Sequence, residues 1–96
     1  MTIAWDTPAK LSLKKQLKRI EEDSIQNAER VRLEILSIIN SIPENPEKFP
    51  LDRFKTDNNG SFRAFEKHSL RIAYFISVGQ IRILRIRHIK QEPKEY

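Results

Sequence analysis

Seven basic side chains and both histidines gather in one stretch near the end of the chain, and these residue types suit chemistry on an anion. Between Arg63 and Gln91 the sequence has seven Lys or Arg and a single acid, Glu66. Charge concentrated in this way predicts a polyanionic partner, either a phosphate backbone or an acidic protein. The alternative is that these residues simply cover the solvent side of an antiparallel sheet. The seven are Arg63, Lys67, Arg71, Arg82, Arg85, Arg87 and Lys90.

The rest of the chain is close to neutral. Residues 1–60 carry ten Lys or Arg and ten Asp or Glu, and residues 92–96 carry one basic and two acidic residues. The net charge of +5 therefore comes from the stretch between Arg63 and Gln91.

Length and composition exclude several classes of protein. Ninety-six residues form one domain with one modest core, which excludes a large two-lobed enzyme. The absence of cysteine excludes a disulfide framework and a thiolate metal site, and two histidines are too few to predict a zinc site. We expect no cofactor and no metal. The longest apolar run, 72–76, is far too short to span a membrane, so we expect a cytoplasmic protein with no membrane partner.

Two amphipathic helices are predicted in the first half of the chain. Thr7 is expected to be the N-cap of the first helix, because Pro8 suits the first helical position. The side chains change from basic at positions 18–19 to acidic at positions 21–23. This change places the break between the helices near residues 22–24. Pro43 is expected to end the second helix. The apolar stripes are Ala9, Leu13, Leu17 and Ile20 in the first helix and Ala28, Val31, Ile35, Ile38, Ile39 and Ile42 in the second.

Strand patterns precede the helices and follow the connection after them. Two-residue turns separate the last three candidates, which predicts antiparallel hairpins. In the last strand Ile81 and Ile83 share one parity, while Leu84 and Ile86 share the other. This slip predicts either a bulge near Ile83–Leu84 or burial of both faces, and it favours a central, strongly twisted strand. The candidate strands are residues 2–5, 61–67, 70–77 and 80–89.

These elements predict an α+β fold. An N-terminal strand and a two-helix hairpin would pack on one face of a twisted antiparallel sheet, and the other face would present the basic residues. Residues 1–96 form the single domain, with 91–96 as a mobile tail. Aromatic residues in the strand candidates are expected to pack in the core or along its edge, namely Trp5, Phe62, Tyr74 and Phe75.

Four segments in this order resemble the RelE/ParE superfamily of bacterial toxins. They are IAWDTPAKLSLKKQL, INSIPENPEKFPLDRF, FRAFEKHSLRIAY and RILRIRHIKQEPKEY. The resemblance implies the toxin of a type II toxin-antitoxin pair, inhibited by a directly bound cognate antitoxin. RelE-like members cut mRNA on the ribosome, whereas ParE-like members inhibit DNA gyrase.

The resemblance also implies roles for individual residues. Arg71 lies in LRIAY, which is similar to the RelE-like YRLVY, and would bind phosphate. Lys90 and Tyr96 reproduce the RelE-like spacing of a basic residue and a tyrosine six positions apart, and Arg63 matches a basic position on the preceding strand. His88 matches the C-terminal histidine of YoeB-like and HigB-like toxins.

RNA cleavage by its own 2′-oxygen needs a base, cations around the phosphate and an acid for the leaving oxygen, and it needs no metal. We expect Arg71 and Arg63 to bind the phosphate, His88 to transfer the proton and Tyr96 to stack on a base or orient the substrate. The favoured function is a ribosome-dependent mRNA endonuclease. A ParE-like gyrase inhibitor and a member without activity are the alternatives. Contacts to nucleic acid are expected from Lys67, Arg82, Arg85 and Arg87.

Overall fold

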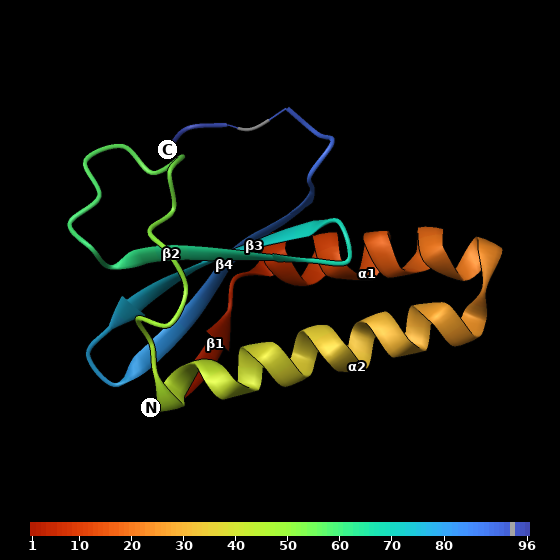
Figure 1. Ribbon diagram of the computed structural model, residues 1–96, viewed down its shortest axis with the longest axis horizontal. Coiled ribbons are helices and arrows are strands. Elements are labelled where there is room, and N and C mark those ends of the chain that lie inside the picture. The colour runs from red at the N-terminus through yellow and green to blue at the C-terminus, as the bar shows by residue number, and fades with distance from the viewer. Residues whose placement is uncertain (93) are drawn as a thin grey trace.

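The computed structural model describes residues 1–92 and 94–96. Figure 1 shows two antiparallel helices on one side of a sheet. The segment between the second helix and the next strand, residues 45–61, lies on the other side with the C-terminal segment, and we call it the connection. No helix in the described part of the chain is long and apolar enough to cross a bilayer. The elements are β1 (Thr2–Trp5), α1 (Thr7–Asp23), α2 (Ile25–Ser41), the 3₁₀ turn η1 (Ile42–Glu44), β2 (Phe62–Lys67), β3 (Leu70–Ser77) and β4 (Gln80–His88).

The sheet has the strand order β1-β4-β3-β2, so β4 is central, as the sequence predicts. β3 pairs antiparallel with both β2 and β4. β1 pairs with β4 in parallel, so the sheet is mixed, whereas the sequence predicts an antiparallel sheet. A parallel pair needs a long crossover, and here both helices and the first hairpin separate the two strands. The predicted α+β fold, with a helical hairpin packed on a sheet, is confirmed.

A bulge in β4 decides which side chains face the helices. Ala73 pairs with Arg85 and Tyr74 pairs with Ile83, so Leu84 has no opposite residue on β3. The extra residue shifts the alternation by one position. The first of the two predicted alternatives is therefore confirmed. Ile81, Ile83 and Ile86 share the buried face, while Arg82, Arg85 and Arg87 share the other.

The helix boundaries follow local hydrogen bonding. Ser24 separates the helices at the predicted break, and its hydroxyl accepts a hydrogen bond from the Asn27 N–H at 3.0 Å. The prediction that Thr7 caps α1 is wrong by one residue, because Asp6 occupies the N-cap. The Asp6 carboxylate does not cap the helix; it pairs with Arg82 at 3.0 Å. α2 ends at Ser41, just before the 3₁₀ turn that contains Pro43.

The core lies between the helical hairpin and the sheet. Tyr74 is fully buried there, and its hydroxyl donates a hydrogen bond to the Pro46 carbonyl at 2.7 Å. Burial raises the pKa of Tyr74. Its hydroxyl therefore satisfies a polar group inside the core and fixes the start of the connection after α2. The same cluster contains Leu13, Val31, Ile35 and Ile39 from the helices and Leu70, Ile72, Ile81, Ile83 and Ile86 from the sheet.

Candidate functional site

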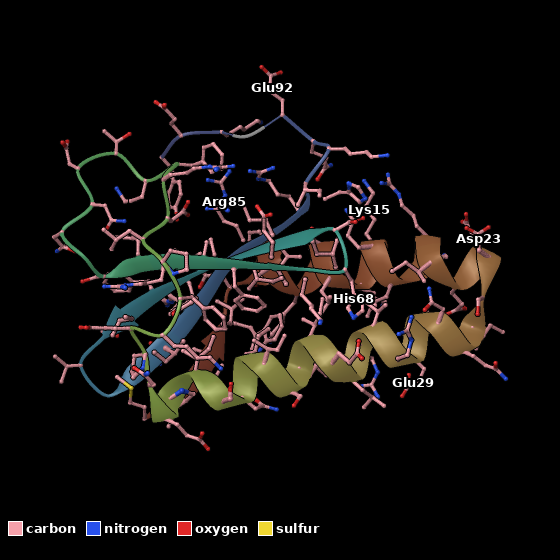
Figure 2. The ribbon with its side chains drawn as sticks, in the orientation of Figure 1. Lys15, Asp23, Glu29, His68, Arg85 and Glu92 are labelled. Carbon is pink, nitrogen blue, oxygen red and sulfur yellow. The ribbon has the colours of Figure 1, made fainter. Side chains whose placement is uncertain are left out.

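Three arginines meet on the sheet face that points away from the helices. Arg71 on β3 pairs with Arg87 on β4, and Arg85 lies two residues earlier on β4. The bulge at Leu84 places Arg85 and Arg87 on the same face as Arg71, away from Ile81 and Ile83. We call Arg71, Arg85 and Arg87 the arginine cluster. Figure 2 shows Arg85 pointing toward the C-terminal segment, on the side of the sheet opposite His68.

A buried carboxylate, Asp52, neutralises part of the arginine cluster. Asp52 is 3% exposed, and its Oδ1 accepts a hydrogen bond from Arg71 Nη2 at 2.8 Å and from the Phe54 N–H at 3.0 Å. Its Oδ2 accepts a hydrogen bond from the Tyr96 hydroxyl at 2.7 Å. Burial alone would raise the pKa of Asp52, but the bonds from Tyr96 and Arg71 outweigh burial and lower it. Asp52 is therefore ionised in the folded protein at neutral pH.

Two aromatic rings cover the guanidinium groups of the arginine cluster. Phe54 lies 4.9 Å from Arg71 and 5.1 Å from Arg87, measured from ring centroid to guanidinium carbon. Tyr96 lies 4.6 Å from Arg85 in the same sense. These distances are within the range of cation–π attraction, which strengthens when the cation is withdrawn from water. The rings therefore hold the cations in place and also shield them from solvent.

The last residue of the chain is fastened to the connection. The Tyr96 N–H donates to the Phe54 carbonyl at 3.0 Å, and the Tyr96 backbone oxygen accepts from the Thr56 N–H at 2.7 Å. Burial raises the pKa of the Tyr96 hydroxyl, and the hydrogen bond to the Asp52 carboxylate raises it further. The sequence predicts a mobile tail over 91–96. Its terminal residue makes these fixed contacts, and Pro93 lies outside the described residues.

The arginine cluster is closed. The cavity that it lines with Asp52, Phe54 and Tyr96 has a volume of about 10 Å³, which is about the smallest space that holds one water molecule. Arg85 Nη1 donates to the Lys94 carbonyl at 3.2 Å, and Arg87 Nη1 donates to the Gln91 carbonyl at 3.0 Å. The cavity between these guanidinium groups is therefore too small to hold a nucleic-acid phosphate.

Arg63 lies on the opposite side of the sheet from Arg71. It pairs with the buried Tyr74 across β2 and β3, whereas Arg71 pairs with Glu66. Arg63 Nη1 donates to the Glu47 carbonyl at 3.2 Å and the Phe49 carbonyl at 3.0 Å. These bonds fasten the connection after α2 to the edge of the sheet. The structure therefore does not bring together the two arginines that the sequence assigns to one phosphate.

His88 also lies apart from the arginine cluster. It pairs with Leu70 at the end of β4, on the face that carries the core, and its Nδ1 accepts a hydrogen bond from the Lys90 N–H at 3.1 Å. Lys90 and Lys67 are exposed. Arg82 is half-exposed and pairs with Asp6. Of the predicted site residues, the structure brings together Arg71, Arg85, Arg87 and Tyr96.

Sequence reasoning missed the two residues that organise this cluster, Asp52 and Phe54. Both lie in the segment PLDRF of the connection, where neither helical nor strand periodicity marks them. The only signal was the acid itself, because a sheet face with several arginines needs a counter-charge. Among residues 1–92 and 94–96, no group of three His, Asp or Glu side chains is arranged to hold a metal ion.

A family model identifies the chain. The model described as the ParE toxin of the type II toxin-antitoxin system parDE matches residues 3–93. The chain belongs to the ParE toxin family. It is thus a toxin of a type II toxin-antitoxin system within the RelE/ParE superfamily, and the family implies a cognate antitoxin as partner. No curated protein matches the chain.

Two solved structures have the same fold as this ParE-family chain. A structure titled the chromosomal ParDE TA system from P. aeruginosa is 14% identical, covers 92% of this chain and 95% of its own, and has a TM-score of 0.71. The YoeB dimer from Staphylococcus aureus is 15% identical with the same coverage, 92% and 95%, and has a TM-score of 0.53. At these identities the likeness shows the fold alone.

The substitution Asp52→Asn tests the buried ion pair in this ParE-family toxin. Loss of the carboxylate leaves Arg71, whose side chain is 11% exposed, with only the exposed Glu66 as an anionic partner. We therefore expect the free energy of unfolding at pH 7 to fall by about 3–5 kcal/mol. Because the pKa of Asp52 is lowered by folding, its stabilisation is present above the unfolded value of about 3.9 and is lost as pH falls through the folded value. Urea denaturation at several pH values measures both effects. We expect the unfolding free energy of the variant to fall less steeply in acid than that of the wild type.

Glu66→Gln is the matched control, because Glu66 also pairs with Arg71, at 3.1 Å, but its side chain is 46% exposed. An exposed partner contributes less than about 1 kcal/mol. Equal denaturation midpoints for the two variants would contradict the central role of Asp52.

Proposed function

We propose that this toxin acts by binding DNA gyrase as a ParE-like inhibitor, and that it does not cleave mRNA. The observation that carries the proposal is the separation of Arg71 and His88 on opposite faces of the sheet. The match to the ParE family model also supports gyrase over the ribosome as the target.

An mRNA endonuclease needs its phosphate-binding cations and its proton-transfer group around one phosphate, within hydrogen-bond reach of it. Here Arg71 is already paired with two carboxylates, Asp52 and Glu66. Arg63 donates to backbone carbonyls. The candidate proton-transfer residue, His88, lies on the face of the sheet that carries the helices. These residues stabilise the fold of the connection and the sheet, and this arrangement favours a toxin that acts by binding.

A binding toxin needs an accessible charged surface, and several cations outside the arginine cluster provide one. Arg82 has a side chain that is 52% exposed, and Lys67 and Lys90 are exposed. Positive charge of this kind accelerates association with an acidic protein surface. We therefore place the gyrase contact on the exposed cations at the ends of the sheet.

Purified toxin mixed with purified gyrase tests the target directly. We expect the rate of DNA supercoiling to fall with increasing toxin and to recover when the cognate antitoxin is added. In parallel, messages recovered from translating ribosomes after toxin induction should be intact. Messages cleaved inside the ribosome, together with unaffected supercoiling, would replace the gyrase proposal with the endonuclease.

We further propose that the antitoxin contacts the outer side of the helical hairpin. A groove of about 380 Å³ lies between α1 and α2. Its floor is apolar and its rim is cationic, which suits an amphipathic segment with acidic flanks. The floor is formed by Trp5, Leu13, Leu17 and Leu36, and the rim by Lys10, Lys14 and Arg32.

Charge reversal at the rim of this groove tests the antitoxin contact. Lys14→Glu should weaken the toxin-antitoxin complex about tenfold, because a like charge then faces the acidic segment. Lys18→Glu is the control, since Lys18 is exposed on the same helix and does not line the groove. Calorimetry with the purified antitoxin measures both affinities. Equal losses for the two variants would place the antitoxin elsewhere.

A further inference from the structure

A second cleft lies at the end of the molecule where the two helices meet. Figure 1 shows that α1 and α2 extend past the turn between β2 and β3. The cleft has a volume of about 540 Å³, which is in the range of small-molecule sites. It lies on the helix side of the sheet, opposite the arginine cluster, and nothing in the proposed function uses it.

Basic side chains from four elements line this cleft. Arg19 comes from α1, Arg30 from α2, His68 from the β2–β3 turn and His88 from the end of β4. Asp23 is the single acid in the lining. Because Nδ1 of His88 accepts the Lys90 N–H, neutral His88 carries its proton on Nε2, which remains available as a donor. The cleft therefore collects donors suited to an anion.

His68 is held in the cleft by the two-residue turn between β2 and β3. His68 and Ser69 have φ values of 53° and 64°, the left-handed region that favours glycine. Positive φ at both central residues is the geometry of a two-residue hairpin turn, and it fixes the direction of the His68 side chain. The Nε2 atom of His68 contacts Glu34 Oε2 on α2, and this bond lowers the pKa of Glu34. Figure 2 shows His68 on the side of the β2–β3 hairpin that faces α2.

The inner part of the cleft combines one polar side chain with an apolar wall. Gln16 is only 4% exposed and lines the cleft. Its amide group has both donors and acceptors to offer a ligand in the cleft. Ile20, Val31 and Leu70 form the apolar wall.

We propose that this cleft binds a phosphate monoester of mononucleotide size. Arginine binds phosphate oxygens in a bidentate manner, which assigns the phosphate to Arg19 and Arg30, with the His88 Nε2–H as a further donor. The apolar wall receives the base or another apolar body, and Gln16 pairs with a polar edge of that body. Asp23 accepts a hydrogen bond from a hydroxyl group of the ligand.

Adenosine 5′-monophosphate is the probe, added to the isotope-labelled full chain and followed by amide chemical shifts. We expect saturable shifts at Asn27, His68 and Ser69. Arg19→Gln and Arg30→Gln should each weaken binding about tenfold or more, the loss expected for a charged hydrogen bond. Arg32→Gln is the matched control: it removes the same charge from α2, but Arg32 pairs with Glu29 at 2.7 Å and does not line the cleft.

Three results would overturn this proposal. Absence of saturable shifts with the nucleotide would mean that the cleft does not bind it. Equal weakening by Arg32→Gln would indicate general charge attraction without a site. Tighter binding of a short DNA duplex at the same amides would assign the cleft to nucleic acid. Thermal unfolding of each variant confirms that a loss of binding does not come from loss of the fold, and inorganic phosphate distinguishes a phosphate subsite from a site for the whole nucleotide.

Discussion

The ion pair between Asp52 and Arg71 is the interaction on which the open face of the sheet depends. One carboxylate, 3% exposed, accepts hydrogen bonds from β3, from the connection and from the last residue of the chain. A buried charge is stable only when its partners are in place, because its desolvation is otherwise uncompensated. The connection and the C-terminal residue are therefore fixed to the sheet together, and the same contacts close the arginine cluster against a phosphate.

The bulge at Leu84 places the last two arginines of β4 on the same face of the sheet as the ion pair. Without the extra residue, Arg85 and Arg87 would alternate onto the face that carries Ile81 and Ile83. With it, the aliphatic residues of β4 stay in the core and its arginines stay with Arg71. One inserted residue thus separates the sheet into a face that holds the helices and a face that holds the cations.

Much of the fold follows from the sequence. The helical stripes, the break at Ser24, the central position of β4 and the bulge are all marked by periodicity or by capping chemistry. The site is less predictable, because it depends on which residues far apart in sequence face each other. Periodicity does not predict that Asp52 bonds to the Tyr96 hydroxyl, or that Arg63 and Arg71 lie on opposite faces of the sheet. The faces on which Arg63 and Arg71 lie depend on which residues of β2 and β3 pair with each other. That pairing is given by the register of the hairpin.

The titration of the Asp52 carboxyl carbon, followed by NMR in the wild-type chain, tests the central claim most directly. A carboxylate held by Tyr96 and Arg71 should titrate below the ordinary aspartate pKa of about 3.9. Titration at or above that ordinary value in the folded protein would show that Asp52 and Arg71 do not form a stabilising ion pair. It would contradict the claim that this pair fixes the connection and Tyr96 to the sheet.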